Sequence, residues 1–423
     1  MDLNLLTATA AARAIASGEI TAEDLIRGCI ARIDQREPTV RAWASLDPAR
    51  ALSEARERDR SFARRGAVSP LHGIPVGIKD MIDTADLPTQ HNSPIYRGHR
   101  PGQDAACVAV LRAAGAIILG KTETVEFAAG GRKAPTTNPH DRSRTPGGSS
   151  SGSAAAVADF QVPLAFGTQT GGSLIRPASF CGIFALKPSW GLVSREGAKL
   201  ASLSFDTIGW YARSIADLAA VAELFQIIDA PLAPPPMEKL RIAICPSPVF
   251  EHAAAETRAA LSRGAEILAA SGARCETLQL DSRFDGLVDA HETIALGETR
   301  AAFLAEYRRA GHLLDDDFKA KVENRAGITS QRLRDAYDLA GECRAGFDRI
   351  AAGFDAVLTR PRSAKPRLGW PARATMSSTG SGPCFTSPAW PCPGSRGPMG
   401  SRSGSSWSVR ALKTGGCSPS ATP

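Results

Sequence analysis

Apolar positions near the N-terminus recur at helical spacing and predict two helices. Residues 7–17 are alanine-rich and stop at a glycine, a residue that commonly ends a helix. Thr21 and Asp24 match a capping box that opens a second helix, which we expect to run to about Asp34. One face of this second helix carries its apolar residues: Leu25, Ile26, Cys29, Ile30 and Ile33. Residues 1–60 are therefore expected to form N-terminal helices that pack on a core.

Further along the chain, short apolar runs alternate with helical patterns. Residues 74–78 form an apolar run typical of a buried strand, and residues 104–122 pass from helical spacing to a second such run. The alternation repeats between residues 214 and 280. Strands that alternate with helices predict an α/β sandwich. We expect this core over residues 61–359, with a mostly helical segment at about 281–352.

Two glycine–serine turns flank a run of small residues in the middle of the chain. The turns lie at residues 147–150 and 171–173, and the run at residues 154–158 predicts a tightly packed helix. Glycine permits unusual backbone angles and a close approach of the backbone to a ligand. The consecutive amides of the second turn can converge on one point and bind an anion. Such a pair of turns is suited to an enzyme that transfers an acyl group.

These segments resemble the amidase signature family. The resemblance rests on three motifs in the order typical of the family: Gly-Ile-Pro-Val-x-x-Lys-Asp at residues 73–80, Gly-Gly-Ser-Ser at 147–150 and Thr-Gly-Gly-Ser at 170–173. It extends from about residue 5 to about residue 359. The resemblance implies the amidase-signature fold, a mixed β-sheet sandwiched between helices, in which the helical segment at about 281–352 shapes the substrate entrance.

By this resemblance, Lys79, Ser149 and Ser173 form a Ser–cis-Ser–Lys triad. Burial would lower the pKa of Lys79, so that its neutral amine takes a proton from Ser149, which in turn deprotonates the nucleophile Ser173. The alternative for Lys79 is a plain surface position, where most lysines lie. A set of backbone amides would hold the oxyanion that then forms: those of Gln169, Thr170, Gly171 and Gly172. The expected reaction is hydrolysis of a small carboxamide to a carboxylic acid and ammonia through an acyl-enzyme, with no metal and no cofactor.

Three positions differ from the commonest pattern of the family. Ser151 replaces a glycine, Gln169 stands where many members have aspartate, and Arg176 lies three residues after the nucleophile instead of two. These differences affect the charges behind the triad and not the triad itself. We expect Ser150 and Arg176 to support the catalytic residues from behind. Arg176 has two open roles, orienting the nucleophile loop or binding a carboxylate of the substrate.

Several of these residues have alternative interpretations. Residues 148–152 also fit the G-x-S-x-G pattern of a nucleophile elbow centred on Ser150, although a Gly/Ser-rich run matches it by composition alone. The seven histidines lie in no recognisable motif, which disfavours a Ser–His–Asp triad. Glu126 and Phe127 match a family segment near the substrate pocket, and a structural role is the alternative. Cys181 is expected to be a small buried hydrophobe.

Composition restricts the class of protein and its location. With 423 residues, 43% of them hydrophobic, the chain can fill one large core or two domains. It shows no signal-peptide pattern and no apolar run near the ~20 residues of a membrane span, so we expect a cytoplasmic location. Its nine cysteines lack the C-x-x-C spacing of zinc sites. The expected partner is a small-molecule amide, with no nucleic acid and no membrane. Because family members often form dimers, a homodimer is considered as well.

The tail at residues 360–423 differs abruptly from the preceding chain. It contains nine Lys and Arg residues and no Asp or Glu, so the net charge of +7 comes from the tail. Half of its residues are Pro, Gly or Ser, a composition that favours disorder over a packed core. A shift of reading frame converts two of its segments into family-like sequence. We interpret the tail as a frameshift product that lacks the C-terminal strand and helix of the family.

Two alternatives to a stand-alone amidase stay open. An inactive remnant of a disrupted amidase gene would keep the same motifs, and we expect the altered C-terminus to reduce activity and stability. The other alternative is the amidase subunit of a tRNA-dependent amidotransferase. Residues 191–210 disfavour it, because they resemble the corresponding segment of stand-alone amidases.

Overall fold

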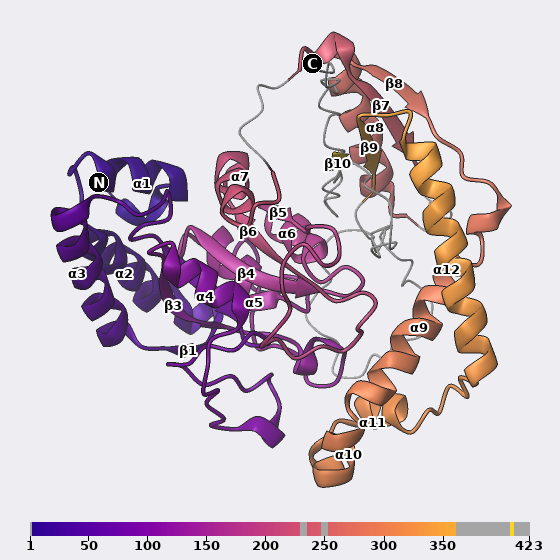
Figure 1. Cartoon of the computed structure of the whole chain (residues 1–423), viewed down its shortest axis with the longest axis horizontal. Helices are drawn as coiled ribbons and strands as arrows, with labels where there is room; N and C mark the ends of the chain where they lie inside the picture. The colour runs from indigo at the N-terminus through magenta and orange to yellow at the C-terminus, as the bar shows by residue number, and fades with distance from the viewer. Residues whose placement is uncertain (1, 229–234, 247–252, 361–406, 410–423) are drawn as a thin grey trace, which may run out of the picture.

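The strands among the described residues form two separate sheets, linked by helices. The computed structural model describes residues 2–228, 235–246, 253–360 and 407–409. Within these residues, one sheet has six strands and the other has four (Figure 1). The expected α/β architecture is confirmed, but the second alternation of strands and helices builds its own sheet and does not extend the first.

The six-stranded sheet has the order β1-β3-β2-β4-β6-β5. Its strands are β1 (Trp43–Leu46), β2 (Pro75–Lys79), β3 (Ile117–Thr122), β4 (Leu164–Gln169), β5 (Phe184–Leu186) and β6 (Thr207–Ala212). β2 runs parallel to β3 and β4, whereas β1 is antiparallel to β3, and β6 is antiparallel to both β4 and β5. The sheet is therefore mixed, as expected.

Helices cover this sheet, and the small residues of α5 (Ser151–Ala158) let it pack closely on the strands. The other helices of this region are α4 (Ala106–Ala113), α6 (Ile175–Cys181) and α7 (Ile215–Leu224). Every residue of α5 is buried, which confirms the tightly packed helix expected over residues 154–158. At Gly152 an added Cβ would lie 2.1 Å from the carbonyl oxygen of Ala42 and 2.4 Å from the amide nitrogen of Glu123. Only glycine fits there, so α5 can approach the backbone of its neighbours.

The N-terminal helices pack on one side of this core, at the left of Figure 1. They are α1 (Ala8–Ala16), α2 (Ala22–Val40) and α3 (Pro48–Arg65). The capping box is present, since the Thr21 side chain accepts from the Asp24 amide and the Asp24 carboxylate accepts from the Thr21 amide. The expected end of α2 at Asp34 is wrong. The helix continues past Pro38 to Val40, a buried residue, and ends where Arg41 adopts a left-handed conformation with φ 51°.

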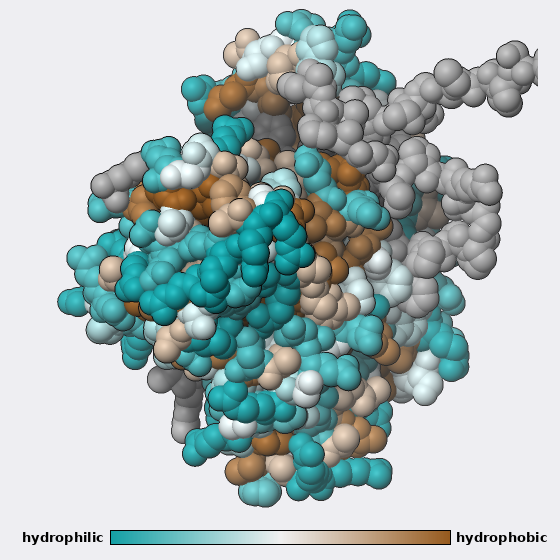
Figure 2. All heavy atoms as spheres, turned by 60° about the vertical axis from the view of Figure 1, so that its left-hand side comes forward, coloured by the Kyte–Doolittle hydropathy of each residue, from teal (hydrophilic) through white to brown (hydrophobic). Residues whose placement is uncertain are grey.

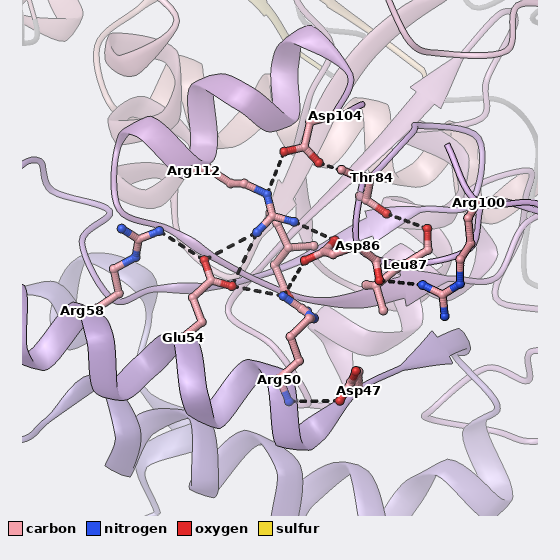
Figure 3. Close-up of polar contacts among 12 residues, drawn as sticks. Asp47, Arg50, Glu54, Arg58, Thr84, Asp86, Leu87, Arg100, Asp104 and Arg112 are labelled. Carbon is pink, nitrogen blue, oxygen red and sulfur yellow. Dashed lines mark hydrogen bonds and ion pairs between the residues drawn. The ribbon is translucent and has the colours of Figure 1, made fainter. Parts of the chain in front are cut away.

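Ion pairs fasten α3 to α4 and to the loop between β2 and α4 (Figure 3). On α3, Glu54 accepts from Arg50 and Arg58, each at 3.1 Å. Arg112 of α4 pairs with Asp86 at 2.8 Å, and Asp86 also pairs with Arg50 at 2.8 Å. Because α3 buries only Ala51 and Ala55, charged side chains hold much of this helix in place. Hydrophilic residues accordingly predominate on the face that comes forward in Figure 2.

The four-stranded sheet lies at the upper right of Figure 1 and has the order β10-β9-β7-β8. Its strands are β7 (Arg241–Cys245), β8 (Arg274–Thr277), β9 (Ala356–Thr359) and β10 (Trp407–Val409), and α8 (Ala255–Ala270) packs on β8 and β9. β7 is parallel to β8 and β9, and β10 is antiparallel to β9. β10 is the part of the tail that the structure describes. The disorder and the frameshift were expected for residues 360–423. The expected disorder is wrong at β10, which is a strand paired with β9, and residues 361–406 and 410–423 lie outside the described residues.

A group of helices, called here the helical arm, lies between β8 and β9 in the chain. It consists of α9 (Leu287–Ala302), α10 (Leu304–Ala310), α11 (Asp316–Val322) and α12 (Ser330–Ala351), and it matches the helical segment expected at about 281–352. α9 and α12 lie side by side (Figure 1). None of the helices in the described ranges is long and apolar enough to cross a membrane.

Candidate active site

Lys79 is the most enclosed of the three residues expected to form the triad. It ends β2, a central strand of the six-stranded sheet, and its side chain is 0% exposed. Its Nζ lies 2.8 Å from Ser149 Oγ and 2.6 Å from Thr168 Oγ1, on the adjacent strand β4. The buried-strand interpretation of residues 74–78 is confirmed, and the surface interpretation of Lys79 is wrong.

The surroundings of Lys79 favour its neutral form. Burial lowers the pKa of Lys79 well below its ordinary value, because a charged ammonium group loses its hydration inside the protein. The negative charge of Asp206 opposes this effect, and the positive charge of Arg176 adds to it. A neutral amine within hydrogen-bonding distance of a serine hydroxyl can act as its base.

Hydrogen bonds to two successive carbonyl groups, those of Gly148 and Ser149, hold the main chain at Ser149. The Gly148–Ser149 peptide bond is cis. The Gly148 carbonyl accepts hydrogen bonds from the Arg176 guanidinium, at 2.9 Å from Nε, and the Ser149 carbonyl accepts from the Val125 amide at 3.2 Å. Arg176 therefore holds the loop that carries Ser149, which differs from both of its expected roles, and those two roles stay predictions.

Ser173 lies in the loop between β4 and α6, and its main chain is fixed to the loop that carries Ser149. The Ser173 carbonyl accepts from the Ser150 amide at 3.3 Å and from the Tyr211 hydroxyl at 3.2 Å. Exposure increases from 0% at Lys79 to 4% at Ser149 and 8% at Ser173. This order suits a base inside the protein and a nucleophile toward the outside.

The predicted oxyanion residues start at the end of β4. The Gln169 side chain accepts from the amides of Leu174 at 2.8 Å and Ile175 at 3.1 Å, so it fixes the far side of the loop that carries Ser173, the predicted nucleophile. The Thr170 hydroxyl donates to Asp206. Thr170 and Gly171 are partly exposed, whereas Gln169 is buried. The loop is therefore anchored at its base and open at its tip, and oxyanion binding there stays a prediction.

Ser150 has a position that differs from that of Ser173. Its side chain is 0% exposed, and its Oγ donates to the Thr168 carbonyl at 3.1 Å and accepts from the Thr168 amide at 3.3 Å. Both bonds join the start of α5 to β4. These contacts favour the supporting role of Ser150 over the nucleophile-elbow interpretation, which needs an exposed hydroxyl.

The sequence model of the family described as "Amidase" matches residues 24–343, more than half of the chain. The chain belongs to the amidase family. The resemblance to amidase signature enzymes is thereby confirmed, and the matched residues contain Lys79, Ser149 and Ser173.

Relatives of this amidase-family chain include subunits of glutamyl-tRNA(Gln) amidotransferases. It is 48% identical over 225 residues to a glutamyl-tRNA(Gln) amidotransferase subunit of Chloroflexus aggregans, in an alignment that covers 52% of the chain and 46% of the relative. The chain thus spans about half the length of the curated relatives that it matches.

Two solved structures share the fold over most of their length. The native peptide amidase from Stenotrophomonas maltophilia is similar with a TM-score of 0.71 and 29% identity, over 84% of this chain and 83% of the other. A structure described as a vestigial protein complex that reveals the origins of an s-triazine catabolic enzyme has a TM-score of 0.77 and 28% identity, over 86% and 83%. The amidase-signature fold is therefore shown for this chain.

Glu126 and Phe127 are used for packing. Glu126 is 0% exposed, and its carboxylate accepts from Ser93 at 2.8 Å and from the Arg132 guanidinium at 2.7 Å. Phe127 is also 0% exposed and packs against Phe303 and Phe318 of the helical arm, with tilted rings at centroid distances of 4.8 and 5.3 Å. These contacts support the structural alternative for both residues.

Three residues of the site carried no recognisable signal in the sequence. Thr168 contacts Lys79, Tyr211 binds the Ser173 carbonyl, and Asp206 binds Thr170. Each contact depends on the pairing of β4 with β2 or β6, which joins residues far apart in the chain.

Metal and thiol chemistry find little support in the site. Within the described ranges, no group of three or more His, Cys, Asp or Glu residues is arranged to hold a metal ion. Cys181 is 0% exposed, and burial raises the pKa of its thiol, which disfavours a reactive thiolate. Its Sγ contacts the Pro146 carbonyl. The position matches the buried hydrophobe that we expected.

Proposed function

We propose that the chain hydrolyses the C–N bond of a carboxamide through Lys79, Ser149 and Ser173. The observation that carries this proposal is the wholly buried Lys79 Nζ, 2.8 Å from Ser149 Oγ. A lysine can serve as a base only when its neutral form is populated, and burial provides that condition here.

The reaction would proceed through an acyl-enzyme. Lys79 takes the proton of Ser149 while Ser149 takes that of Ser173, and the Ser173 oxygen attacks the amide carbonyl. Amides at the tip of the nucleophile loop stabilise the oxyanion, and the Ser149 hydroxyl returns a proton to the leaving nitrogen. The C–N bond breaks, ammonia leaves, and water then releases the carboxylic acid from Ser173.

We propose that the amide donor is used within an amidotransferase-like assembly. The 48% identity to a glutamyl-tRNA(Gln) amidotransferase subunit supports this alternative better than the stand-alone activity on a small amide that the sequence suggested first. On this proposal the chain supplies ammonia to a partner protein. Stand-alone hydrolysis is the second candidate, because the similarity to a peptide amidase extends over 84% of the chain.

A serine-reactive fluorophosphonate probe tests the site directly. We expect the purified chain to be labelled, and Ser173→Ala and Lys79→Ala to lose labelling. Ser17→Ala, at an exposed serine on the end of α1, is the matched control and should be labelled fully. Folded protein without labelling would contradict the proposal and favour the inactive remnant. Labelling lost only in Ser150→Ala would favour the nucleophile elbow.

Ammonia release distinguishes the two candidate functions. The chain is incubated with glutamine, asparagine and simple carboxamides, alone and with the other subunits of a bacterial amidotransferase. Ammonia release from glutamine that rises with the added subunits supports the amidotransferase role. Full turnover of simple carboxamides by the chain alone supports the stand-alone enzyme.

A further inference from the structure

Asp206 is a buried carboxylate beside the nucleophile loop. It immediately precedes β6, whose first residue Thr207 pairs with Gln169 at the end of β4. The side chain is 5% exposed and accepts hydrogen bonds from three donors: the Thr170 hydroxyl, the Ala201 amide at 2.6 Å and the Ser202 amide at 3.1 Å. Three donors of this kind stabilise the ionised carboxylate, although burial raises the pKa of Asp206.

Lys79 and Asp206 approach the end of β4 from its two sides, because Lys79 ends β2 and Asp206 immediately precedes β6. Lys79 binds Thr168, and Asp206 binds Thr170, two residues further along. The carboxylate and the amine thus bracket the turn into the nucleophile loop, and the charge of Asp206 acts on Lys79.

The segment that carries Asp206 is fixed from the other side by the helical arm. Glu298 of α9 accepts from the Ser204 amide at 3.0 Å and from the hydroxyls of Ser202 and Ser204. Tyr337 of α12 donates to the same carboxylate at 2.6 Å. Asp206 therefore has a defined position that does not depend on the nucleophile loop.

We propose that Asp206 is a positioning residue for the hydrolysis: it anchors Thr170 at the start of the nucleophile loop and places a negative charge opposite Lys79. This inference rests on the proposed function. The charged groups that face Lys79 are Asp206 and Arg176, and those that face Asp206 are Lys79 and Arg195. Loss of the Asp206 charge leaves Lys79 facing Arg176 alone.

Two variants separate the anchor from the charge. Asp206→Asn removes the charge and keeps the shape of the side chain, whereas Thr170→Val removes the anchoring bond and keeps the charge. We expect both to lower kcat about tenfold, the size of one lost hydrogen bond. Without the negative charge the pKa of Lys79 falls further, so the acidic limb of the kcat/KM profile moves to lower pH in Asp206→Asn. The acidic limb should keep its pH in Thr170→Val. Thr170→Ser, which keeps the hydroxyl, should recover most of the kcat that Thr170→Val loses.

The control is Asp338→Asn, at an exposed carboxylate on α12, which should change neither kcat nor the pH profile. An unmoved acidic limb in folded Asp206→Asn, with undiminished kcat in Thr170→Val, would overturn the inference. If Asp206→Asn does not fold, the failure of Thr170→Ser to recover activity overturns the anchoring role. Labelling of the unmodified chain by the serine probe is measured in parallel. A labelled chain whose variants behave normally contradicts this inference alone, and an unlabelled chain contradicts the proposed function.

Discussion

The two sheets of the molecule differ in how completely they are enclosed. Every residue of β2, β3, β4 and β6 in the six-stranded sheet is buried, and Lys79 lies among them. In the four-stranded sheet, three of the four residues of β8 are exposed: Arg274, Glu276 and Thr277. The candidate active site thus lies on the sheet whose buried strands keep water away from the Lys79 amine. Enclosure is what makes a lysine a usable base, and the described strands of the second sheet contain no lysine.

The largest expected effect comes from Lys79→Met, which keeps the volume of the side chain and removes the amine. Under the proposed mechanism, activity falls by about 10³-fold or more, because the serine loses its base. The free energy of unfolding should rise in this variant. A buried amine whose pKa is lowered by folding destabilises the folded chain at every pH below the pKa that the lysine has in the unfolded chain.

The sign of this stability effect can be checked by pH. Between the folded and unfolded pKa values of Lys79 the unfolded chain binds one more proton, so the free energy of unfolding of the unmodified chain rises by about 1.4 kcal/mol per pH unit from this residue. The advantage of Lys79→Met in urea titrations should therefore shrink as pH rises toward 10. An advantage that grows with pH would contradict the buried neutral amine.

The same substitution should have opposite effects in the two regions. Gly152→Ala places a Cβ 2.1 Å from the Ala42 carbonyl oxygen, so we expect a loss of about 4 kcal/mol or more in the free energy of unfolding. Gly341→Ala, on α12, places its Cβ where no atom lies within 4 Å, and should gain about 0.5–1 kcal/mol. Thermal and urea unfolding of both variants measures the difference. An equal loss of unfolding free energy in the two variants would contradict the difference in packing between Gly152 and Gly341.

A core substitution in the second sheet should leave the active site intact. Leu358 of β9 is 2% exposed and packs with Ile242 and Leu261. Leu358→Ala should cost about 3 kcal/mol and increase amide hydrogen exchange in β7 and β9, with probe labelling of Ser173 unchanged at 25 °C. Ile267→Ala, at a residue that is 51% exposed on α8, is the control and should cost little. Lost labelling in Leu358→Ala alone would show that the two sheets unfold together.

The smallest expected effect concerns an exposed ion pair of the N-terminal helices. Hydrogen bonds from Arg56 and Arg27 lower the pKa of Glu23 to about 2. A depressed carboxylate pKa contributes stability above the pKa of the unfolded chain, and that contribution is lost as pH falls toward 2. Glu23→Gln should therefore unfold at a slightly lower temperature than the unmodified chain at pH 6, and at the same temperature near pH 2. A difference that persists near pH 2 would assign it to packing.

Local signals in the sequence predicted local features well. The capping box at Thr21, the small-residue helix α5 and the buried strand β2 each depend on neighbouring residues, and the structure confirms them. The end of α2 was wrong because Val40 is buried by tertiary packing, which extends the helix past a proline. Local propensity contains no information on such packing.

The candidate site was predictable only where a motif marks it. The glycine–serine turns and the lysine strand identify Lys79, Ser149 and Ser173, but the residues that hold them come from elsewhere. Asp206 and Tyr211 reach the loop of Ser173 because β6 pairs with β4 in one register. A register between distant strands is set by the packing of the whole sheet, so no local pattern could assign these two residues.

The enclosure of Lys79 also determines where its proton can go. A base with no exposed surface exchanges protons with bulk water through its hydrogen-bonded neighbours, and Ser149 is one of these neighbours of Lys79. Under the proposed mechanism, a proton taken from the nucleophile stays within the protein until the leaving nitrogen accepts it. The product ammonia would then carry away the same hydrogen that the serine gave up.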